Sequence, residues 1–178
     1  MRPPFDAPTA EDVRIVSLQL GRPARDVVGI SARCVCGAPT VVSTKPRLAD
    51  GTPFPTFYYL THPAATAAVS TLEANGVMPE LAGLLADDEI HDAYRETHMS
   101  YIADRESFDV VEEIIGISAG GMPDRVKCLH ALVGHSLAAG PGVNPIGDLA
   151  LARAAWSPTV CVCLDYSAAA ATGETVPE

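Results

Sequence analysis

The apolar residues near the start of the chain follow the spacing of a helix. Thr9–Asp12 resembles a capping box with Asp in place of Glu or Gln, and Val13, Val16 and Leu20 follow at intervals that bring them toward one face. Gly21 comes directly after them, and glycine commonly ends a helix. The pattern therefore predicts a short first helix that ends at Gly21.

Four later segments combine apolar residues at helical spacing with a start signal, either a proline at the first helical position or a capping Asp or Asn. Their expected extents are Pro63 to Asn75–Gly76, a short helix from Pro79, Asp88 to about Arg105, and Asn144–Pro145 to about Trp156. Residues Phe108–Ile117 are compatible with either a strand or a loop.

Three segments before the second helix are rich in β-branched and aromatic residues. Val27–Arg33 and Thr40–Lys45 flank a Cys-Val-Cys-Gly turn, and Thr56–Thr61 follows after a proline-bearing loop. Strands that are sequential and hairpin-like favour antiparallel pairing over a parallel sheet alternating with helices. We predict an α+β fold, a small three-stranded antiparallel sheet packed by about five or six helices. Thr159–Leu164 is a candidate for a final strand.

The run Ser118–Asp148 is the centre of the chain, because it joins a glycine loop, a helix and a second loop. Pro123 suits the first helical position and Gly140 suits the end, so we expect a helix from about Met122 to Ala139. Both faces of that helix are apolar or small, which indicates burial on much of its circumference. Its expected core residues are Val126, Leu129, Leu132, Val133 and Leu137.

The length of 178 residues favours one domain with a real core. We expect a disordered N-terminus over 1–9, a single globular domain over 10–165 and a disordered tail over 166–178. The first ten residues lack the apolar segment of a signal peptide, and no stretch has the ~18 uninterrupted apolar residues of a membrane span. The expected location is the cytoplasm.

The formal charge of −10 argues against unspecific binding to nucleic acid or to an anionic membrane. The charges are nevertheless uneven along the chain. The segment Glu73–Glu113 is densely acidic, so the pattern fits either a local basic pocket or two solvated faces of opposite sign. The basic residues of the first third are Arg22, Arg25, Arg33, Lys45 and Arg47.

The five cysteines form two C-x-C pairs and one single residue, which suits reduced thiols or metal ligands better than a disulfide scaffold. Cys34 and Cys36 can present two thiolates from the hairpin turn, and His62 ends the neighbouring strand. Cys128 is our choice for a fourth ligand. A closed site of this kind would hold structural zinc, whereas an open fourth position would suit catalysis. The alternative is ordinary packing of cysteine and hydrogen bonding of histidine.

The remaining cysteines and histidines have plainer interpretations. Cys161 and Cys163 lie in an apolar stretch, where packing is the favoured reading, and His91 and His98 lie on an acidic helix with an expected solvated face. His130 and His135 are further ligand candidates. On a regular helix neither lies suitably beside Cys128 for a thiol–imidazole pair, so a cysteine-nucleophile enzyme is a minor alternative.

Glycines followed by basic residues make a candidate anion site at the start of the predicted central helix. Free N–H groups and a positive dipole at a helix start favour anions, although the spacing is not that of a P-loop. The alternative is a flexible loop with solvated charges. The predicted anion-binding residues are Gly120, Gly121, Arg125, Lys127 and Arg47, with Arg33 or Lys45 as further candidates to close the pocket.

Three motifs, RCVCGAP, PRLADGTPFPTFYYLTHP and SAGGMPDRVKCLHALVGHSLAAGPGVNPIGD, together resemble the actinobacterial family known as domain of unknown function 501. The resemblance covers roughly Val13–Leu151, apart from Phe108–Ile117. It implies an actinobacterial cytoplasmic protein without an established activity. In that family Cys can stand where this chain has His62, an exchange that a zinc ligand would permit.

Two functions follow as hypotheses. The first is a zinc-stabilised binding or regulatory module with a phosphate-type anion pocket, whose partner is a phosphate-bearing small molecule or a protein. The alternative is a metal-dependent hydrolase that acts on a phosphate-containing substrate. Neither hypothesis involves nucleic acid or a membrane.

Overall fold

The structure is a computed structural model that describes residues 6–164 and Tyr166. Of the segments expected to be disordered, residues 1–5 and 167–178 lie outside the described residues. The N-terminal residues that are described make contacts, because Asp6 forms an antiparallel bridge with Ile30.

The fold is α+β, as predicted, with a three-stranded antiparallel sheet and six α-helices among the described residues. The strands are β1 (Val27–Arg33), β2 (Pro39–Thr44) and β3 (Tyr58–Leu60). The helices are α1 (Ala10–Leu20), α2 (Pro63–Ala74), α3 (Val77–Gly83), α4 (Asp88–Phe108), α5 (Leu129–Ala139) and α6 (Pro145–Arg153), with short 3-10 turns η1 (Leu84–Ala86) and η2 (Glu112–Ile114).

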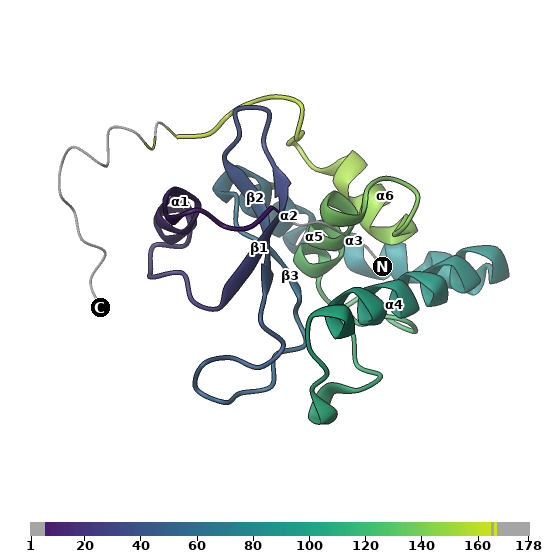
Figure 1. Ribbon diagram of the computed structural model, residues 1–178. Helices are drawn as coiled ribbons and strands as arrows, with labels where there is room; N and C mark the ends of the chain where they lie inside the picture. Colours follow the sequence, from purple (N-terminus) through teal and green to yellow (C-terminus); the bar gives the residue numbers. More distant parts are fainter. Residues whose placement is uncertain (1–5, 165, 167–178) are drawn as a thin grey trace.

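The sheet has the order β1-β2-β3 and is covered on both faces (Figure 1). Successive side chains of a strand point to opposite faces. Val42 accordingly joins Val16 of α1 in one apolar cluster, whereas Val41 belongs to the main core with α5. This double cover explains why all six residues of β2 are buried.

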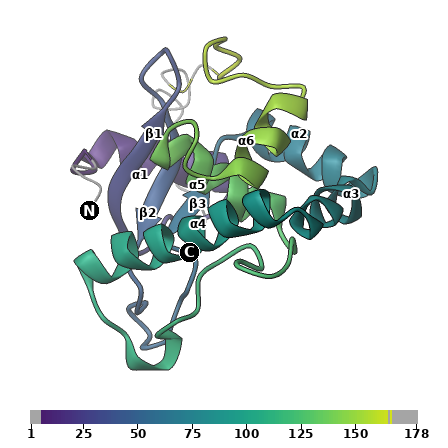
Figure 2. The same ribbon diagram turned by 90° about the vertical axis from the view of Figure 1, so that its right-hand side faces the viewer.

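Helix α5 lies at the centre of the main core and packs against β3, α2 and α6, while α4 passes along the side of this assembly (Figure 2). Leu129, Leu132 and Val133 are fully buried, which confirms them as core residues. Val126 and Leu137 are only partly buried, although both pack against the same core.

The central helix begins at Leu129, so the prediction of a start at Met122 is wrong. The preceding segment instead turns back on the glycine loop. The N–H of Lys127 donates to the Gly120 carbonyl oxygen over 2.7 Å, and that of Arg125 donates to the Gly121 carbonyl oxygen over 3.0 Å. Both glycines have positive φ, which is costly for other residues. The chain at these glycines is therefore not helical, and α5 starts only after the loop.

Helix starts that rest on local signals are largely confirmed. Thr9 forms the predicted capping box with Asp12, and Pro63 and Pro145 stand at the starts of α2 and α6. The cap of α4 is Asp87 rather than Asp88. The short third helix starts at Val77, ahead of Pro79.

Two C-terminal expectations are wrong. The last helix ends at Arg153 rather than near Trp156. The segment Thr159–Leu164 is not a strand, since none of its residues pairs with the sheet and its apolar side chains are exposed. The ambiguous segment after α4 contains only the turn η2. No helix among the described residues is long and apolar enough to cross a membrane.

Asn144 joins α6 to α5 from a fully buried position. Its Oδ1 accepts from the N–H of Gly147 over 2.8 Å, and its Nδ2 donates to the Leu132 carbonyl oxygen over 3.2 Å.

Replacing Asn144 by alanine removes the cap of α6 and leaves the buried Gly147 N–H and Leu132 carbonyl groups without their partner. We expect Asn144→Ala to lower the free energy of unfolding by about 1–3 kcal/mol in urea denaturation. Asn75→Ala, at the exposed end of α2, is the control and should have little effect; equal losses would contradict this role.

Candidate metal centre and the pocket at the start of α5

Cys34 and Cys36 lie on the tight turn that joins β1 to β2. The turn is closed by a hydrogen bond from Gly37 N–H to the Cys34 carbonyl oxygen (2.8 Å), and Gly37 has a φ of 91°. Glycine is the residue that takes this left-handed conformation most readily. Cys34 is buried, whereas the Cys36 side chain is exposed.

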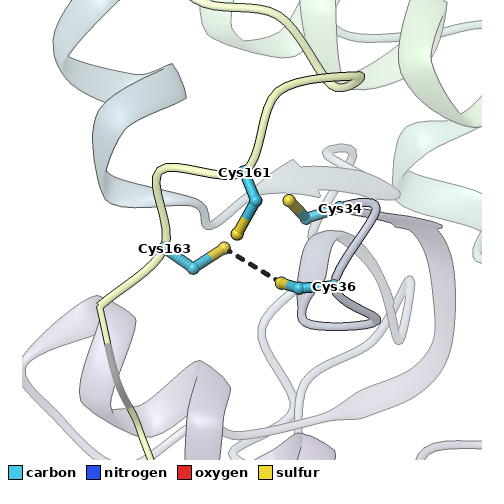
Figure 3. A group of neighbouring side chains, drawn as sticks. All are labelled: Cys34, Cys36, Cys161 and Cys163. Carbon is cyan, nitrogen blue, oxygen red and sulfur yellow. Dashed lines mark hydrogen bonds between the residues drawn. The ribbon is translucent and has the colours of Figure 1, made fainter.

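Cys161 and Cys163 approach the same turn from the opposite end of the chain. The segment after α6 runs past the β1–β2 turn (Figure 1), and its two thiols point toward Cys34 and Cys36 (Figure 3). The four sulfur atoms lie within 4.8 Å of one another, and Cys36 Sγ is 3.4 Å from Cys163 Sγ. This four-cysteine group could hold a metal ion.

The structure thus divides the predicted ligands. Cys34 and Cys36 lie together as predicted, but the thiols beside them are those of Cys161 and Cys163. The prediction that this second pair serves only for packing is therefore wrong. Cys161 is exposed and its neighbours Val160 and Val162 are more than half exposed, which shows that the apolar stretch is not a core segment.

His62 touches the cysteine group but from outside it. Its Nε2 is 3.2 Å from Cys163 Sγ, and its Nδ1 accepts from the Ala65 N–H at the start of α2. An accepting Nδ1 leaves the proton on Nε2, which can then donate to the sulfur. Burial lowers the pKa of His62, which favours this neutral form. The residue is therefore placed to orient Cys163.

The environment of the four thiols is mixed. Burial raises the pKa of Cys34 and of Cys163, whereas a hydrogen bond from the Ala38 N–H lowers that of Cys36 to about 7. A tetrahedral zinc ion with Zn–S bonds of about 2.3 Å would keep its sulfurs about 3.8 Å apart. The Cys36–Cys163 distance of 3.4 Å and the upper limit of 4.8 Å on the other distances lie on either side of that value, so these residues fit a closed metal site.

Cys128 lies in a second group, with Glu73 and His130. One ligand atom from each of the three lies within 4.8 Å of the others. Glu73 comes from α2, while Cys128 is the residue that precedes α5 and His130 belongs to its first turn. His135, the other histidine candidate, is buried and stacks on Tyr58 with ring centroids 5.4 Å apart.

Cys128 and His130 line a pocket of about 710 Å³ that lies between β3, the glycine loop and the start of α5. The predicted anion-binding residues Gly120, Gly121, Arg125 and Lys127 line this pocket, although the glycines lie well before the helix rather than at its start. Extra side-chain atoms at either glycine are excluded. A Cβ at Gly120 would stand 2.6 Å from Leu132 Cδ2, and one at Gly121 would stand 2.6 Å from the Arg125 carbonyl oxygen.

The three basic residues of the first third that were predicted to join this pocket pair with carboxylates elsewhere. Arg47 does not line the pocket and pairs with Glu113 over 2.5 Å. Arg33 and Lys45 are likewise paired with carboxylates. Within the part of the chain that the structure describes, Arg125 and Lys127 take part in no ion pair, and both are exposed residues that line the pocket.

His98 was expected on a solvated face and is instead partly buried. Its Nδ1 lies 2.8 Å from the Ser118 Oγ, so it helps to hold the glycine loop against α4. His91 lies on the same helix and approaches the Asp124 carboxylate at 3.8 Å. Neither histidine belongs to the two groups described above.

Three residues of the two groups were missed from the sequence. For Cys161 and Cys163 the repeat of the C-x-C spacing was a usable signal, because two such pairs give the four thiolates of a closed site. For Glu73 there was none, since it is one of many acidic residues on predicted helices.

A family model described as a protein of unknown function, DUF501, matches residues 30–152. The chain belongs to this family. The match includes Cys34, Cys36 and the whole Glu73–Cys128–His130 group, and it ends before Cys161. No curated protein and no solved structure matches the chain.

Strand β1, which ends at Arg33 directly before Cys34, is tied to α1 by Asp12. The buried Asp12 carboxylate accepts from Arg33 over 2.6 Å and from the Thr9 N–H over 3.0 Å. The Arg33 guanidinium, followed by the Thr9 hydrogen bonds, lowers the pKa of Asp12 from 3.8 to about 2 despite burial. The ionised form is therefore the one that stabilises the fold.

Because the folded-state pKa of Asp12 is depressed, its contribution is fully present above about pH 4–5 and is lost as the pH falls from 3.8 toward 2. We expect Asp12→Asn to lower the free energy of unfolding by about 1–2 kcal/mol at pH 7. The difference from wild type should vanish near pH 2 in denaturant titrations. Glu11→Gln, at the exposed neighbour, is the control; a pH-independent loss at Asp12 would refute the linkage.

Proposed function

We propose that the chain is a zinc-stabilised binding or regulatory module of the cytoplasm, with a pocket for a phosphate-type anion. The observation that carries the zinc site is the convergence of two C-x-C pairs, 127 residues apart between Cys36 and Cys163. A reducing compartment keeps such thiols available for metal.

Zinc suits this group better than the hard cations do, because thiolates are soft ligands that magnesium and calcium avoid. Four thiolates close the coordination shell and leave no position for water or substrate. The metal then acts as a cross-link between the β1–β2 turn and the C-terminal segment. This closed arrangement favours the module over a hydrolase that would act through the metal at this group.

The anion pocket rests on charge and shape. Arg125 and Lys127 stand at the rim of a cavity whose size suits a small ligand. Neither side chain pairs with a carboxylate among the residues that the structure describes, although the chain as a whole is acidic, with a net charge of −10. A phosphate-bearing small molecule, or a protein that presents such a group, is the proposed partner.

Zinc binding is tested by elemental analysis of protein purified without added metal. We expect about one zinc per chain, and its loss in Cys34→Ser and in Cys163→Ser because each removes one of four ligands. Loss of a cross-link worth a few kcal/mol should lower the melting temperature by roughly 5–10 °C.

The matched control for these variants is Cys128→Ser, which makes the same change at the cysteine outside the group and should keep its zinc. The four-thiol assignment would be overturned by a metal-free wild type. It would equally be overturned if Cys128→Ser lost zinc while Cys163→Ser retained it.

Anion binding is tested by titrating inorganic phosphate and pyrophosphate in a calorimeter. Arg125→Ala/Lys127→Ala should weaken binding at least about tenfold, since two charge-assisted contacts are removed. Raising the salt from 50 to 500 mM should weaken the wild type as well, because the screening length of exposed charges falls from more than about 10 Å to less than about 8 Å over this range.

The control is Arg22→Ala/Arg25→Ala, which removes two cations from a different cavity, of about 640 Å³ between α1 and the sheet. That variant should bind as wild type does. Loss of binding in the control would show that the anion binds near Arg22 and Arg25 instead. Equal heats for wild type and the Arg125/Lys127 variant would show that these two residues do not bind the anion.

A further inference from the structure

The group Glu73–Cys128–His130 has no part in the proposed zinc site, yet it places a thiol, an imidazole and a carboxylate within 4.8 Å of one another. Its thiol and imidazole line the pocket, and all three side chains are partly buried. A nucleophile beside a base that is oriented by a third group is the arrangement used in covalent catalysis. The hydrogen bonds around His130 decide which protons this group holds.

The Nε2 atom of His130 lies 3.2 Å from the Thr66 carbonyl oxygen and 3.1 Å from the Ser70 Oγ. A carbonyl oxygen only accepts, so Nε2 carries a proton. On the other side of the ring, Nδ1 lies 3.3 Å from Glu73 Oε1, which is also an acceptor when ionised. Glu73 Oε1 is fixed in place by the Leu129 N–H at 2.7 Å. The surroundings therefore favour a doubly protonated imidazolium.

An imidazolium beside a thiol stabilises the thiolate. The nearby Cys128 thiol is the largest cause that raises the pKa of His130, and the nearby imidazole is in turn the largest cause that lowers the pKa of Cys128. The Ala131 N–H at the start of α5 adds to the lowering, while burial opposes it. Positions before a helix and next to a cationic histidine are those where cysteines become reactive.

This pairing depends on the observed start of α5. On a continuous helix Cys128 and His130, two positions apart, would point in different directions. Cys128 instead has extended backbone angles, φ −150° and ψ 107°, and precedes the first helical residue. The change of backbone direction at this residue lets its sulfur turn toward His130.

We propose that Cys128 is a nucleophilic thiolate with His130 as its acid–base partner and Glu73 as the positioning residue, in a pocket that takes a carboxylic ester with an anionic group. The anionic part of the ester rests on the proposed function of Arg125 and Lys127. The thiolate–imidazolium pair stands without it.

The reaction divides into two steps. The Cys128 thiolate attacks the ester carbonyl carbon; the C–S bond forms, the C–O bond to the leaving group breaks, and His130 gives its proton to the leaving oxygen. Neutral His130 then takes a proton from water, the resulting hydroxide attacks the thioester carbon, and the C–S bond breaks. The products are an alcohol and a carboxylic acid, and the thiolate and imidazolium are restored.

The thiolate is tested by alkylation of the zinc-loaded protein with iodoacetamide between pH 5 and 9. Cleavage after Lys127 and Arg153 gives a tryptic peptide in which Cys128 is the single cysteine, so mass spectrometry reports its rate separately. The wild type should remain reactive well below pH 8.5, the ordinary pKa of a thiol. At pH 6.5, His130→Gln should react at least about tenfold more slowly, because it removes the cation that stabilises the thiolate.

Two variants separate positioning from folding. Glu73→Gln keeps an oxygen for the Leu129 N–H but loses the charge, and it is this charge that raises the pKa of both His130 and Cys128. The pKa of His130, followed by NMR, should therefore fall, whereas the pH–rate profile of alkylation should move less than it does in His130→Gln. His91→Gln changes a histidine outside the pocket and should keep the wild-type profile. A wild-type profile in His130→Gln would overturn the pair, as would an ordinary thiol profile in the wild type.

Catalysis is tested with p-nitrophenyl acetate and with the anionic mono-p-nitrophenyl succinate. The expected result is a burst of about one nitrophenolate per chain that Cys128→Ala abolishes and His91→Gln retains. The preference for the anionic ester should fall in Arg125→Ala/Lys127→Ala. An unchanged preference would refute the anion pocket but not the thiolate, whereas a missing burst together with normal phosphate binding would refute the catalytic proposal alone.

A metal at this group is the competing outcome. Wild-type protein would then retain a second zinc through gel filtration, and that zinc would protect Cys128 from alkylation. Its loss in both Cys128→Ser and Glu73→Gln, with the first zinc kept, would overturn the nucleophile in favour of a three-ligand metal site.

Discussion

The near-complete burial of α5 is the constraint on which the rest of the structure depends. Gly134 allows this helix to lie directly on β3, where a Cβ atom would already stand 3.3 Å from the Tyr58 carbonyl oxygen. A helix held this closely on the sheet, with α2 and α6 packed on its other sides, cannot slide or rotate without opening voids in the core. Its first turn is therefore fixed, and so are the directions of Cys128 and His130.

Helix α2 connects the two groups that carry chemistry. His62 caps its start and reaches Cys163 of the four-cysteine group, while Glu73 near its end contacts His130 beside the pocket. Eleven residues of helix separate them by about 16 Å, too far for direct electrostatic interaction to matter much in water. A rigid helix nevertheless relates the two positions, so the place of the carboxylate is linked to that of the four-cysteine group through α2.

The sequence predicted the elements whose signals are local and missed the groups that tertiary structure assembles. The capping box at Thr9 and the prolines of α2 and α6 act within one turn, so spacing alone identifies them. The start of α5 is different, because long-range burial competes with the proline signal at Pro123 and the glycine loop folds back before the helix begins. Regular helix geometry then gave the wrong relation between Cys128 and His130.

The odd number of cysteines has a physical explanation in this arrangement. A C-x-C pair on an extended segment can offer two thiolates to one ion, and two pairs complete a tetrahedron without help from histidine. In the proposed site His62 would donate to a sulfur rather than bind the metal, in keeping with its accepting Nδ1 and lowered pKa. The fifth thiol, that of Cys128, lies outside the four-cysteine group and beside an imidazole that favours its ionised form. In the two proposals one residue type would serve two separate chemistries, and the neighbours of each sulfur decide which one it suits.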